Sequence, residues 1–398
     1  MTIPATEASA GQTCLIIGAS HAGAQLAGQL RRVGWQGRII MVGEELSLPY
    51  HRPPLSKQFI ASDSESNSIA LRPESFYENH AIELRLGTRA ENLDVAHRKV
   101  MLSNGEVLQY DHLALCTGAT ARRLRLGDGL QGVCYLRTVE DALLIRQSVQ
   151  GARRAVVIGG GYVGLEAAAV LRQLGLSVTL LERTDRVLSR VAGVQLSAYM
   201  EALHRRHGVE FAFNADVVAI NGQGRVESVT CSDGQQFAAD LVIIGIGIVP
   251  DTRLAQEAGL RIDNGIWVDE HCRTSEPFVY AAGDCASHPS AFYGHQLRLE
   301  SVQNANDQAR IAAITIHGGD ERYQTVPWFW SDQFDIKLQT AGLSAGYDHV
   351  EIDGSLAAES DGFVIRYYRD GQLLAGDCVN RPRDFMTIRK DLAELAAR

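Results

Sequence analysis

Residues 155–166 read Ala-Val-Val-Ile-Gly-Gly-Gly-Tyr-Val-Gly-Leu-Glu, and the expected architecture follows outward from this stretch. Residues 156–158 form an apolar, β-branched run that is typical of a buried parallel strand. Apolar residues recur at helical spacing over 167–174, and a second strand over 178–181 leads to Glu182. A strand, a glycine-rich turn, a helix and a second strand together predict a dinucleotide-binding unit.

The three glycines of this turn are expected to have separate tasks. Gly159 allows the tight turn, Gly161 lets a pyrophosphate approach the backbone, and Gly164 lets the helix pack on the strand. The phosphate then lies at the positive end of the helix. Glu182 is placed to accept hydrogen bonds from the ribose hydroxyls, which favours NADH, although the neighbouring Arg183 is able to accept the 2′-phosphate of NADPH.

Residues 14–23 read Cys-Leu-Ile-Ile-Gly-Ala-Ser-His-Ala-Gly and repeat the strand–turn–helix pattern. Ser20 replaces the middle glycine, and serine is small enough to let a phosphate approach. A strand over 39–42 then leads to Glu44, where a ribose needs a carboxylate. Two such units in one chain predict two bound dinucleotides.

Length and composition limit the class of protein. A chain of 398 residues with 45% hydrophobic and 21% charged residues is typical of a soluble protein of two or three domains. It has no apolar run long enough to span a bilayer, and residues 1–12 are not expected to form a signal peptide. The net charge of −9 speaks against nucleic acid as a partner. The seven scattered cysteines favour a reducing cytoplasm and argue against a metal site.

Further segments carry candidate functions. Residues 48–57 contain two adjacent prolines and predict a rigid, extended loop that presents Arg52 and Lys57, either to solvent or to a phosphate or an electron-rich ring. Asp284 follows a short apolar strand and a glycine, where it accepts hydrogen bonds from a polyol or caps a helix. Short strands are expected between 82 and 118, with a hairpin turn at 103–105. A helix is expected over about 300–316, strands at 336–343, 348–352, 362–368 and 373–379, and a final helix.

Four motifs make the chain resemble the two-nucleotide flavoprotein reductases. They are Arg-Pro-Pro-Leu-Ser-Lys (52–57), Ala-Ala-Gly-Asp (281–284), Glu-Ser-Val-Gln-Asn-Ala (300–305) and Trp-Phe-Trp-Ser-Asp-Gln-Phe (328–334). Among these flavoproteins, the chain is most similar to the NADH-dependent ferredoxin reductases that serve oxygenases, and the last motif separates this group from the others. The resemblance extends from Cys14 to about Leu395.

This resemblance implies an α/β fold with two Rossmann-like dinucleotide-binding domains, as in glutathione reductase, and a small α+β C-terminal domain. The implied domains are an FAD-binding domain (1–115 and 246–322), an NAD-binding domain (116–245) and the C-terminal domain (323–398).

The resemblance also implies the cofactor contacts. FAD is expected on Gly18, Ser20, His21, Ala22, Gly23, Glu44, Arg52, Lys57, Ala90, Arg122, Asp284, Val302 and Trp330. NADH is expected on Gly159, Gly161, Tyr162, Val163, Gly164, Glu182 and Gly247. Lys57 and Glu166 are the expected catalytic residues: the Lys57 ammonium favours the reduced flavin, and Glu166 pairs with it. A carboxylate that only complements the helix dipole is the alternative for Glu166.

The implied reaction passes electrons from NADH through FAD to a small 2Fe-2S ferredoxin, which feeds a haem monooxygenase or a Rieske dioxygenase. Nicotinamide gives two electrons as hydride, the ferredoxin takes one at a time, and flavin does both. The expected docking residues are Arg310, Arg381, Arg383, Arg389 and Lys390, unless this cluster is only a solvated face. The protein is expected to be a monomer or a weak homodimer.

Three other functions are found among related flavoproteins. A dithiol reductase needs a redox cysteine near the flavin, and residues 49–61 contain none. A rubredoxin reductase and a nicotinamide-sensing flavoprotein of the apoptosis-inducing-factor type remain, and slow electron transfer to every ferredoxin would identify the sensor.

Overall fold

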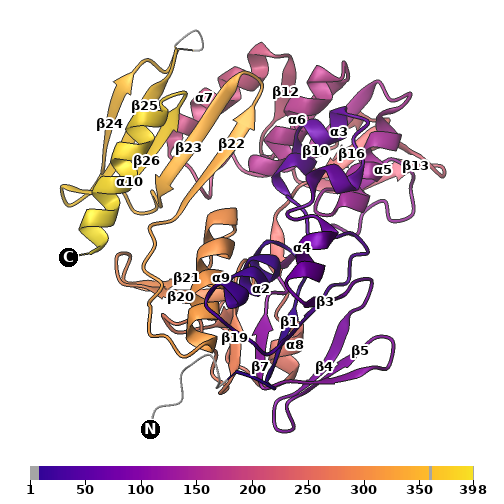
Figure 1. Ribbon diagram of the computed structural model, residues 1–398. Coiled ribbons are helices and arrows are strands. Elements are labelled where there is room, and N and C mark those ends of the chain that lie inside the picture. Colours follow the sequence, from indigo (N-terminus) through magenta and orange to yellow (C-terminus); the bar gives the residue numbers. More distant parts are fainter. Residues whose placement is uncertain (1–8, 358–360, 398) are drawn as a thin grey trace. The chain divides into compact units, whose positions relative to one another are not determined.

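The computed structural model describes residues 9–357 and 361–397 (Figure 1). Its backbone contacts divide into two compact units. Unit 1 consists of Met1–His51, Glu65–Thr120 and Val249–Pro327. Unit 2 consists of Arg52–Ser64, Ala121–Ile248 and Trp328–Arg398.

Unit 1 is built on a five-stranded parallel sheet in the order β19-β7-β1-β2-β3. Its strands are mostly apolar runs because both of its faces are covered. The strands are β1 (Thr13–Ile17), β2 (Arg38–Val42), β3 (Ile82–Arg85), β7 (His112–Leu115) and β19 (Val279–Ala281).

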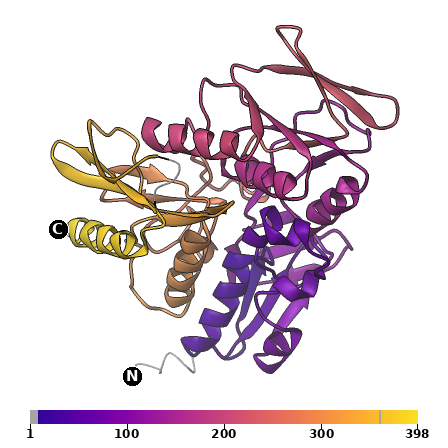
Figure 2. The ribbon, with the colours of Figure 1, turned by 90° about the horizontal axis from the view of Figure 1, so that it is seen from above.

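Two helices, α2 (His21–Arg32) and α9 (Val302–Ile316), lie side by side on this sheet (Figures 1 and 2). Leu26 and Leu30 of α2 share one buried cluster with Ala305, Ala309 and Ala312 of α9. The predicted helix over 300–316 is therefore confirmed, and its alanine face allows the two helices to approach closely.

A second cluster covers the opposite side of the sheet, where Leu93, Val100 and Leu102 pack against Leu15 and Ile17. These residues come from an antiparallel meander whose turn at 103–105 was predicted. The meander consists of β4 (Ala90–Asp94), β5 (Lys99–Leu102) and β6 (Val107–Gln109). The remaining elements of unit 1 are η2 (Ser66–Ile69), α4 (Glu74–Asn79), α8 (Arg253–Glu257), β18 (Ile266–Trp267), β20 (Ala286–Ser290) and β21 (His295–Leu297). The short strands β8 (Ala119–Ala121) and β17 (Ile248–Pro250) run across the boundaries between the units.

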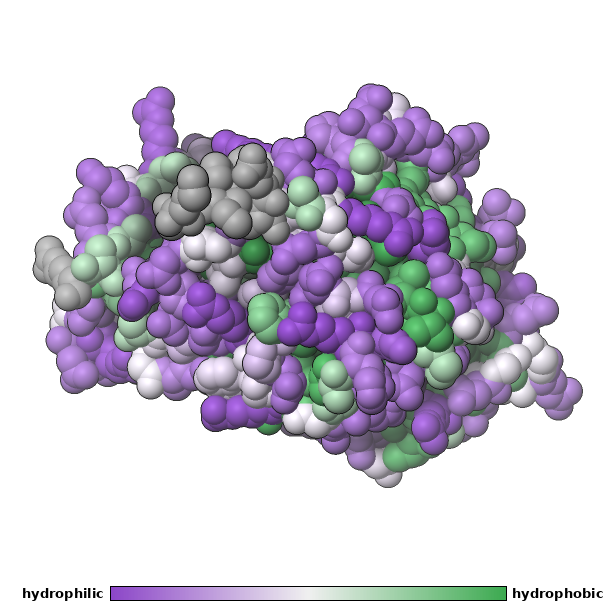
Figure 3. Space-filling model, turned by 60° about the horizontal axis from the view of Figure 1, so that its bottom comes forward, coloured by the Kyte–Doolittle hydropathy of each residue, from purple (hydrophilic) through white to green (hydrophobic). Residues whose placement is uncertain are grey.

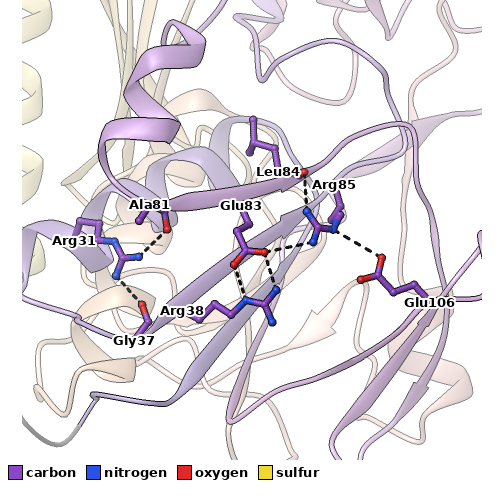
Figure 4. A network of polar contacts seen from close by, with 8 residues as sticks. All are labelled: Arg31, Gly37, Arg38, Ala81, Glu83, Leu84, Arg85 and Glu106. Carbon is purple, nitrogen blue, oxygen red and sulfur yellow. Dashed lines mark hydrogen bonds and ion pairs between the residues drawn. The ribbon is translucent and has the colours of Figure 1, made fainter.

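A polar network at the edge of unit 1 joins β2 to β3 (Figure 4). Arg38 makes two hydrogen bonds to Glu83, of 2.6 and 2.7 Å, and Arg85 lies 3.4 Å from the same carboxylate. Arg31, at the end of α2, donates to the carbonyls of Gly37 and Ala81. Because these groups are well exposed, we expect their ion pairs to stabilise the edge only slightly and to have no catalytic role.

Unit 2 contains a second parallel sheet, in the order β12-β11-β10-β16-β9. Its central strand is the predicted run of residues 156–158. The strands are β9 (Val133–Tyr135), β10 (Arg154–Ile158), β11 (Ser177–Leu181), β12 (Val209–Ala212) and β16 (Leu241–Ile244). The helices are α5 (Val139–Val149), α6 (Tyr162–Gln173) and α7 (Val194–Arg206), and an antiparallel layer is formed by β13 (Val217–Gly222), β14 (Val226–Cys231) and β15 (Gln236–Ala238).

The last part of unit 2 is an antiparallel sheet in the order β22-β23-β26-β25-β24, with α10 (Pro382–Ala396) against β23 and β26. The four predicted strands and the final helix are confirmed, whereas the aromatic stretch at 328–333 is a strand that was not predicted. The strands are β22 (Trp328–Gln333), β23 (Ile336–Gly342), β24 (His349–Gly354), β25 (Phe363–Arg369) and β26 (Gln372–Val379).

The prediction of an extended loop at 48–57 is wrong for its second half. Pro53–Ser56 form a 3₁₀ helix, η1, and Gln58–Ala61 form the short helix α3. Proline is tolerated in the first turn of a helix, because its missing N–H would have no intrahelical partner there. The two prolines therefore start a helix here rather than exclude one.

No helix among the described residues is both long and apolar enough to cross a membrane. The face drawn in Figure 3 is mostly hydrophilic, with smaller hydrophobic areas between.

Candidate functional site

The turn between β10 and α6 has the geometry that its glycines predicted. Gly159 has a φ of +109°, and a Cβ there would lie 2.4 Å from the carbonyl oxygen of Gly245. A Cβ on Gly164 would lie 2.0 Å from the carbonyl oxygen of Gly159. A Cβ on Gly161 would meet nothing within 4 Å. Two of the glycines are thus required by packing, while Gly161 faces open space, as a pyrophosphate site needs.

The N-terminus of α6 fits an anion. The helix begins at Tyr162, and its N-cap, Gly161, has no side chain to accept from the first N–H groups. Such N–H groups and the helix dipole attract phosphate. No capping side chain accepts from these N–H groups, so they are suited to bind a phosphate.

Glu182 lies at the carboxyl end of β11 and reaches back to this turn. Its Oε2 accepts a hydrogen bond of 2.6 Å from the N–H of Gly160. Its Oε1 accepts from the N–H and the hydroxyl of Thr184, each at 2.8 Å. The carboxylate is therefore held beside the glycine turn, where a nucleotide ribose is expected.

The first unit repeats this geometry. Gly18 has a φ of +114°, and a Cβ there would lie 2.0 Å from the carbonyl oxygen of Cys116. A Cβ on Gly23 would lie 2.0 Å from the carbonyl oxygen of Gly18. Ser20 is the extended N-cap of α2, and Glu44 is exposed after β2. Both turns thus fit a dinucleotide by the same backbone criteria.

Gln308 supports the segment that carries Asp284, a role that was not predicted. Its Oε1 accepts a hydrogen bond of 2.8 Å from the N–H of Gly283, and the side chain is fully buried. Gly283 has a φ of +88°, and its Cβ would lie 3.1 Å from that of Ala22 at the start of α2. The backbone beside Asp284 is therefore placed against the first turn of α2.

Lys57 and Glu166 form the expected ion pair. Nζ of Lys57 lies 2.8 Å from Oε2 of Glu166, and the side chains are 15% and 7% exposed. The hydroxyls of Ser56 and Ser331 also donate to this carboxylate, that of Ser331 at 2.5 Å. The pairing is confirmed, and its catalytic role stays a prediction. Both serines lie in the quoted motifs 52–57 and 328–334, but they were not predicted as partners of Glu166.

The other predicted nucleotide contacts of unit 2 lie near α6 or on the loops that follow its sheet. The Tyr162 ring packs edge-to-face on Phe329 at 4.8 Å, and burial holds the pKa of its phenol well above the usual value. Val163 is exposed on the first turn. The carbonyl oxygen of Gly247 accepts from the N–H of Arg122.

The predicted FAD contacts are divided between the two units. Those in unit 1 are Gly18, Ser20, His21, Ala22, Gly23, Glu44, Ala90, Asp284 and Val302. Those in unit 2 are Arg52, Lys57, Arg122 and Trp330, and all the predicted NADH contacts also belong to unit 2. Arg52 donates to the carbonyl of Arg137, and Trp330 lies on β22 with its ring 6.0 Å from that of Trp328.

Several predicted docking cations have acidic neighbours. Arg310 pairs with Glu321 at 2.6 Å in unit 1. In unit 2, Arg381 pairs with Asp384 and Asp353, and Lys390 lies 3.8 Å from Glu394. Arg389 lies over the Trp328 ring at 4.7 Å, and Arg383 is exposed. Acidic side chains therefore lie beside three of the five predicted docking cations.

All seven cysteines are free and buried. Burial raises the pKa of the Cys14 and Cys378 thiols to about 12. Since the thiolate is the reactive form, these thiols are poor nucleophiles.

Taken by themselves, these groups supply two phosphate-binding turns, a ribose carboxylate and a nearly buried ammonium. Hydride transfer between two cofactors needs placement and electrostatics rather than a protein nucleophile. The residues present therefore fit FAD and a nicotinamide dinucleotide.

Comparison with known proteins agrees with this chemistry. The model of the pyridine nucleotide-disulphide oxidoreductase family matches residues 12–309, and that of a reductase C-terminal domain matches residues 328–397. A ferredoxin–NAD(P)(+) reductase of a Sphingomonas species is 46% identical over 94% of this chain and 90% of its own length. Putidaredoxin reductase of Pseudomonas putida is 42% identical, over 95% and 90%. The solved covalent complex of putidaredoxin reductase and putidaredoxin matches with a TM-score of 0.93 and 41% identity, over 97% of this chain and 94% of that chain.

Proposed function

Because the chain belongs to the pyridine nucleotide-disulphide oxidoreductase family, and within it to the ferredoxin reductases, we propose that it passes electrons from NADH through FAD to a 2Fe-2S ferredoxin. The protein is an oxidoreductase that uses FAD and a nicotinamide dinucleotide. The observation that carries the proposal is the presence of two dinucleotide turns with the same backbone geometry in one chain.

Bound FAD supplies the exchange between two-electron and one-electron transfer. The chain's own residues bind and orient the two cofactors. The N–H groups at the start of α6 hold the pyrophosphate of NADH, and Glu182 receives its ribose hydroxyls. A carboxylate at this position repels a 2′-phosphate, which supports NADH over NADPH.

Lys57 is the electrostatic residue of the proposal. An ammonium near the flavin stabilises the negative charge that the ring gains on reduction. Glu166 holds this ammonium in place at 2.8 Å. Lys57 therefore acts on the flavin directly through its charge, whereas Glu166 acts indirectly by holding Lys57 in position.

Similarity to known reductases supports the proposal that the electron acceptor is a ferredoxin and that this ferredoxin feeds an oxygenase. Putidaredoxin reductase, whose sequence is similar over nearly the whole chain, is known in a covalent complex with putidaredoxin. We propose that Arg310, Arg381, Arg383, Arg389 and Lys390 contribute to docking, that the protein is a monomer or weak homodimer, and that it works in the cytoplasm.

The test uses the purified holoenzyme. Stopped-flow mixing with NADH, in the absence of oxygen, is expected to bleach the flavin rapidly, and NADPH to do so much more slowly. Cytochrome c reduction is expected to depend on an added 2Fe-2S ferredoxin and not on an added rubredoxin. Rapid bleaching with a long-lived charge-transfer complex, and no stimulation by any ferredoxin, would instead identify a nicotinamide-sensing flavoprotein.

A further inference from the structure

A series of buried hydrogen bonds leads from Glu166 away from Lys57. The hydroxyl of Ser331 donates to Glu166 Oε1 at 2.5 Å, and Nε2 of Gln333 donates to Ser331 Oγ at 2.9 Å. Oε1 of Gln333 lies 2.8 Å from Nε2 of His204. As whole residues, Glu166, Ser331, Gln333 and His204 are all at most 5% exposed, and all belong to unit 2.

Only one placement of hydrogens satisfies every bond in this series. A carboxylate accepts and does not donate, so the single hydroxyl hydrogen of Ser331 points to Glu166. The oxygen of Ser331 then accepts from the amide nitrogen of Gln333, and the amide oxygen faces His204. His204 must therefore carry its proton on Nε2. Burial lowers its pKa to about 4, which keeps the ring neutral.

This orientation aligns three donors toward one carboxylate. Oε1 of Glu166 accepts from Ser331, while Oε2 accepts from Ser56 and Lys57. Hydrogen bonds to the charged form of a carboxyl group favour that form. The carboxylate, fixed at both oxygens, in turn keeps the Lys57 ammonium in one place.

One face of strand β22 carries both of its polar residues that belong to this series of hydrogen bonds. Ser331 and Gln333 are buried and two residues apart, and Asp332 between them is exposed. Because side chains alternate along a strand, both polar groups point inward together. Their neighbour Trp330, on the same strand, is the predicted flavin contact of the sequence analysis.

We propose that Ser331, aligned by Gln333 and His204, is a positioning residue for the Lys57–Glu166 pair, so that β22 contributes to flavin reduction. The proposal rests on the proposed function, in which Lys57 acts on the flavin. Loss of the Ser331 hydroxyl leaves Oε1 of Glu166 and the amide nitrogen of Gln333 without this partner, and the carboxylate is then held at Oε2 alone, so that it fixes Lys57 less firmly.

The test compares two buried serines in the holoenzyme. Ser331→Ala is expected to shift the flavin midpoint potential to a more negative value. It is also expected to slow flavin reduction at saturating NADH by at least about fivefold, since a hydrogen bond to a charged group is lost. Ser197→Ala is the matched control: Ser197 is 2% exposed on α7 and donates only to the carbonyl of Val187. The control is expected to change neither the potential nor the rate.

A second pair of variants separates polarity from packing. Gln333→Glu keeps the shape of the side chain, but a carboxylate there draws the Ser331 hydroxyl away from Glu166. Gln333→Met keeps the volume and leaves that hydroxyl free to donate to Glu166. The proposal requires the potential to shift more in Gln333→Glu than in Gln333→Met, and this comparison remains valid if Ser331→Ala does not fold.

Equal potentials for Ser331→Ala and Ser197→Ala, with a changed potential for Glu166→Gln, would overturn the positioning role. An unchanged potential for Glu166→Gln would overturn both this role and the electrostatic role of Lys57. If the wild-type enzyme fails to reduce any ferredoxin but Ser331→Ala still shifts the potential, the proposed partner is wrong and the positioning role stands.

Discussion

At the scale of single residues, Lys57 and Glu166 form an ion pair that is nearly buried and hydrogen-bonded at both carboxylate oxygens. Charges of this kind are costly to separate, because a carboxylate left alone in a buried site keeps its desolvation cost without its partner. Substitutions in this pair are therefore expected to change the free energy of unfolding as well as the rate of flavin reduction.

Lys57→Met is expected to lower the free energy of unfolding by about 3 kcal/mol, because it leaves Glu166 buried and unpaired. The double variant Lys57→Met with Glu166→Gln removes both charges and is expected to recover most of this loss. Urea unfolding of the three proteins measures both effects. Equal stability of the single and double variants would mean that solvent already screens the pair.

At the scale of elements, the β10–turn–α6 unit separates glycines required by the fold from a glycine required by the ligand. Gly159 has a positive φ and no room for a Cβ, whereas Gly161 has a φ of −78° and open space around it. The two positions are two residues apart, yet the physical reasons for glycine differ.

Gly161→Ala is expected to leave the melting temperature nearly unchanged while weakening NADH binding, because the methyl group occupies space that the pyrophosphate needs. Gly159→Ala is expected to destabilise the protein by more than about 1 kcal/mol, since the left-handed backbone and the Gly245 carbonyl both oppose it. Thermal melting and the NADH dependence of flavin reduction measure the two effects. The opposite ranking of melting temperatures would contradict this assignment.

The C-terminal sheet packs against α6 and contains a second buried carboxylate, that of Asp377. Asp377 on β26 accepts hydrogen bonds from Thr340 on β23 and from Tyr367 on β25, the latter at 2.7 Å. Burial raises its pKa from 3.8 to about 6, although both hydrogen bonds act in the opposite direction. The native protein thus binds a proton at Asp377 that the unfolded chain has already lost above about pH 4.

The stability contributed by protonated Asp377 is therefore present at low pH and lost as the pH rises through about 6. The unfolding free energy of the wild type is expected to fall relative to that of Asp377→Asn by up to roughly 3 kcal/mol between pH 4 and 7. His204, whose pKa burial lowers to about 4, acts in the opposite direction but is present in both proteins. Urea unfolding at each pH gives the difference, and a constant difference would show that Asp377 does not titrate in this range.

At the scale of the whole molecule, the net charge of −9 conflicts with docking of an acidic ferredoxin unless a local positive surface is used. The proposed cations are partly neutralised by Glu321, Asp384 and Glu394. Arg383, which is exposed, is thus the better choice for a charge reversal.

Ferredoxin-dependent cytochrome c reduction is expected to slow several-fold between low and moderate ionic strength, because salt screens exposed charges beyond about 10 Å. Arg383→Glu is expected to raise the KM for ferredoxin and to flatten this salt dependence. Flavin reduction by NADH in the same solutions is the control, and it should change in neither case. A salt dependence that Arg383→Glu leaves unaltered would place docking on another surface.

The sequence by itself determined both strand–turn–helix units, the helix over 302–316, most of the C-terminal strands and the partner of Lys57 by resemblance. These features depend on glycine spacing and on apolar periodicity, which act between neighbours along the chain. Only the tertiary structure decided that prolines 53 and 54 begin a helix and that Ser56 and Ser331 meet at Glu166. Those serines lie 110 and 165 residues from Glu166 in the sequence, and such contacts depend on how the strands are ordered, which no local pattern encodes.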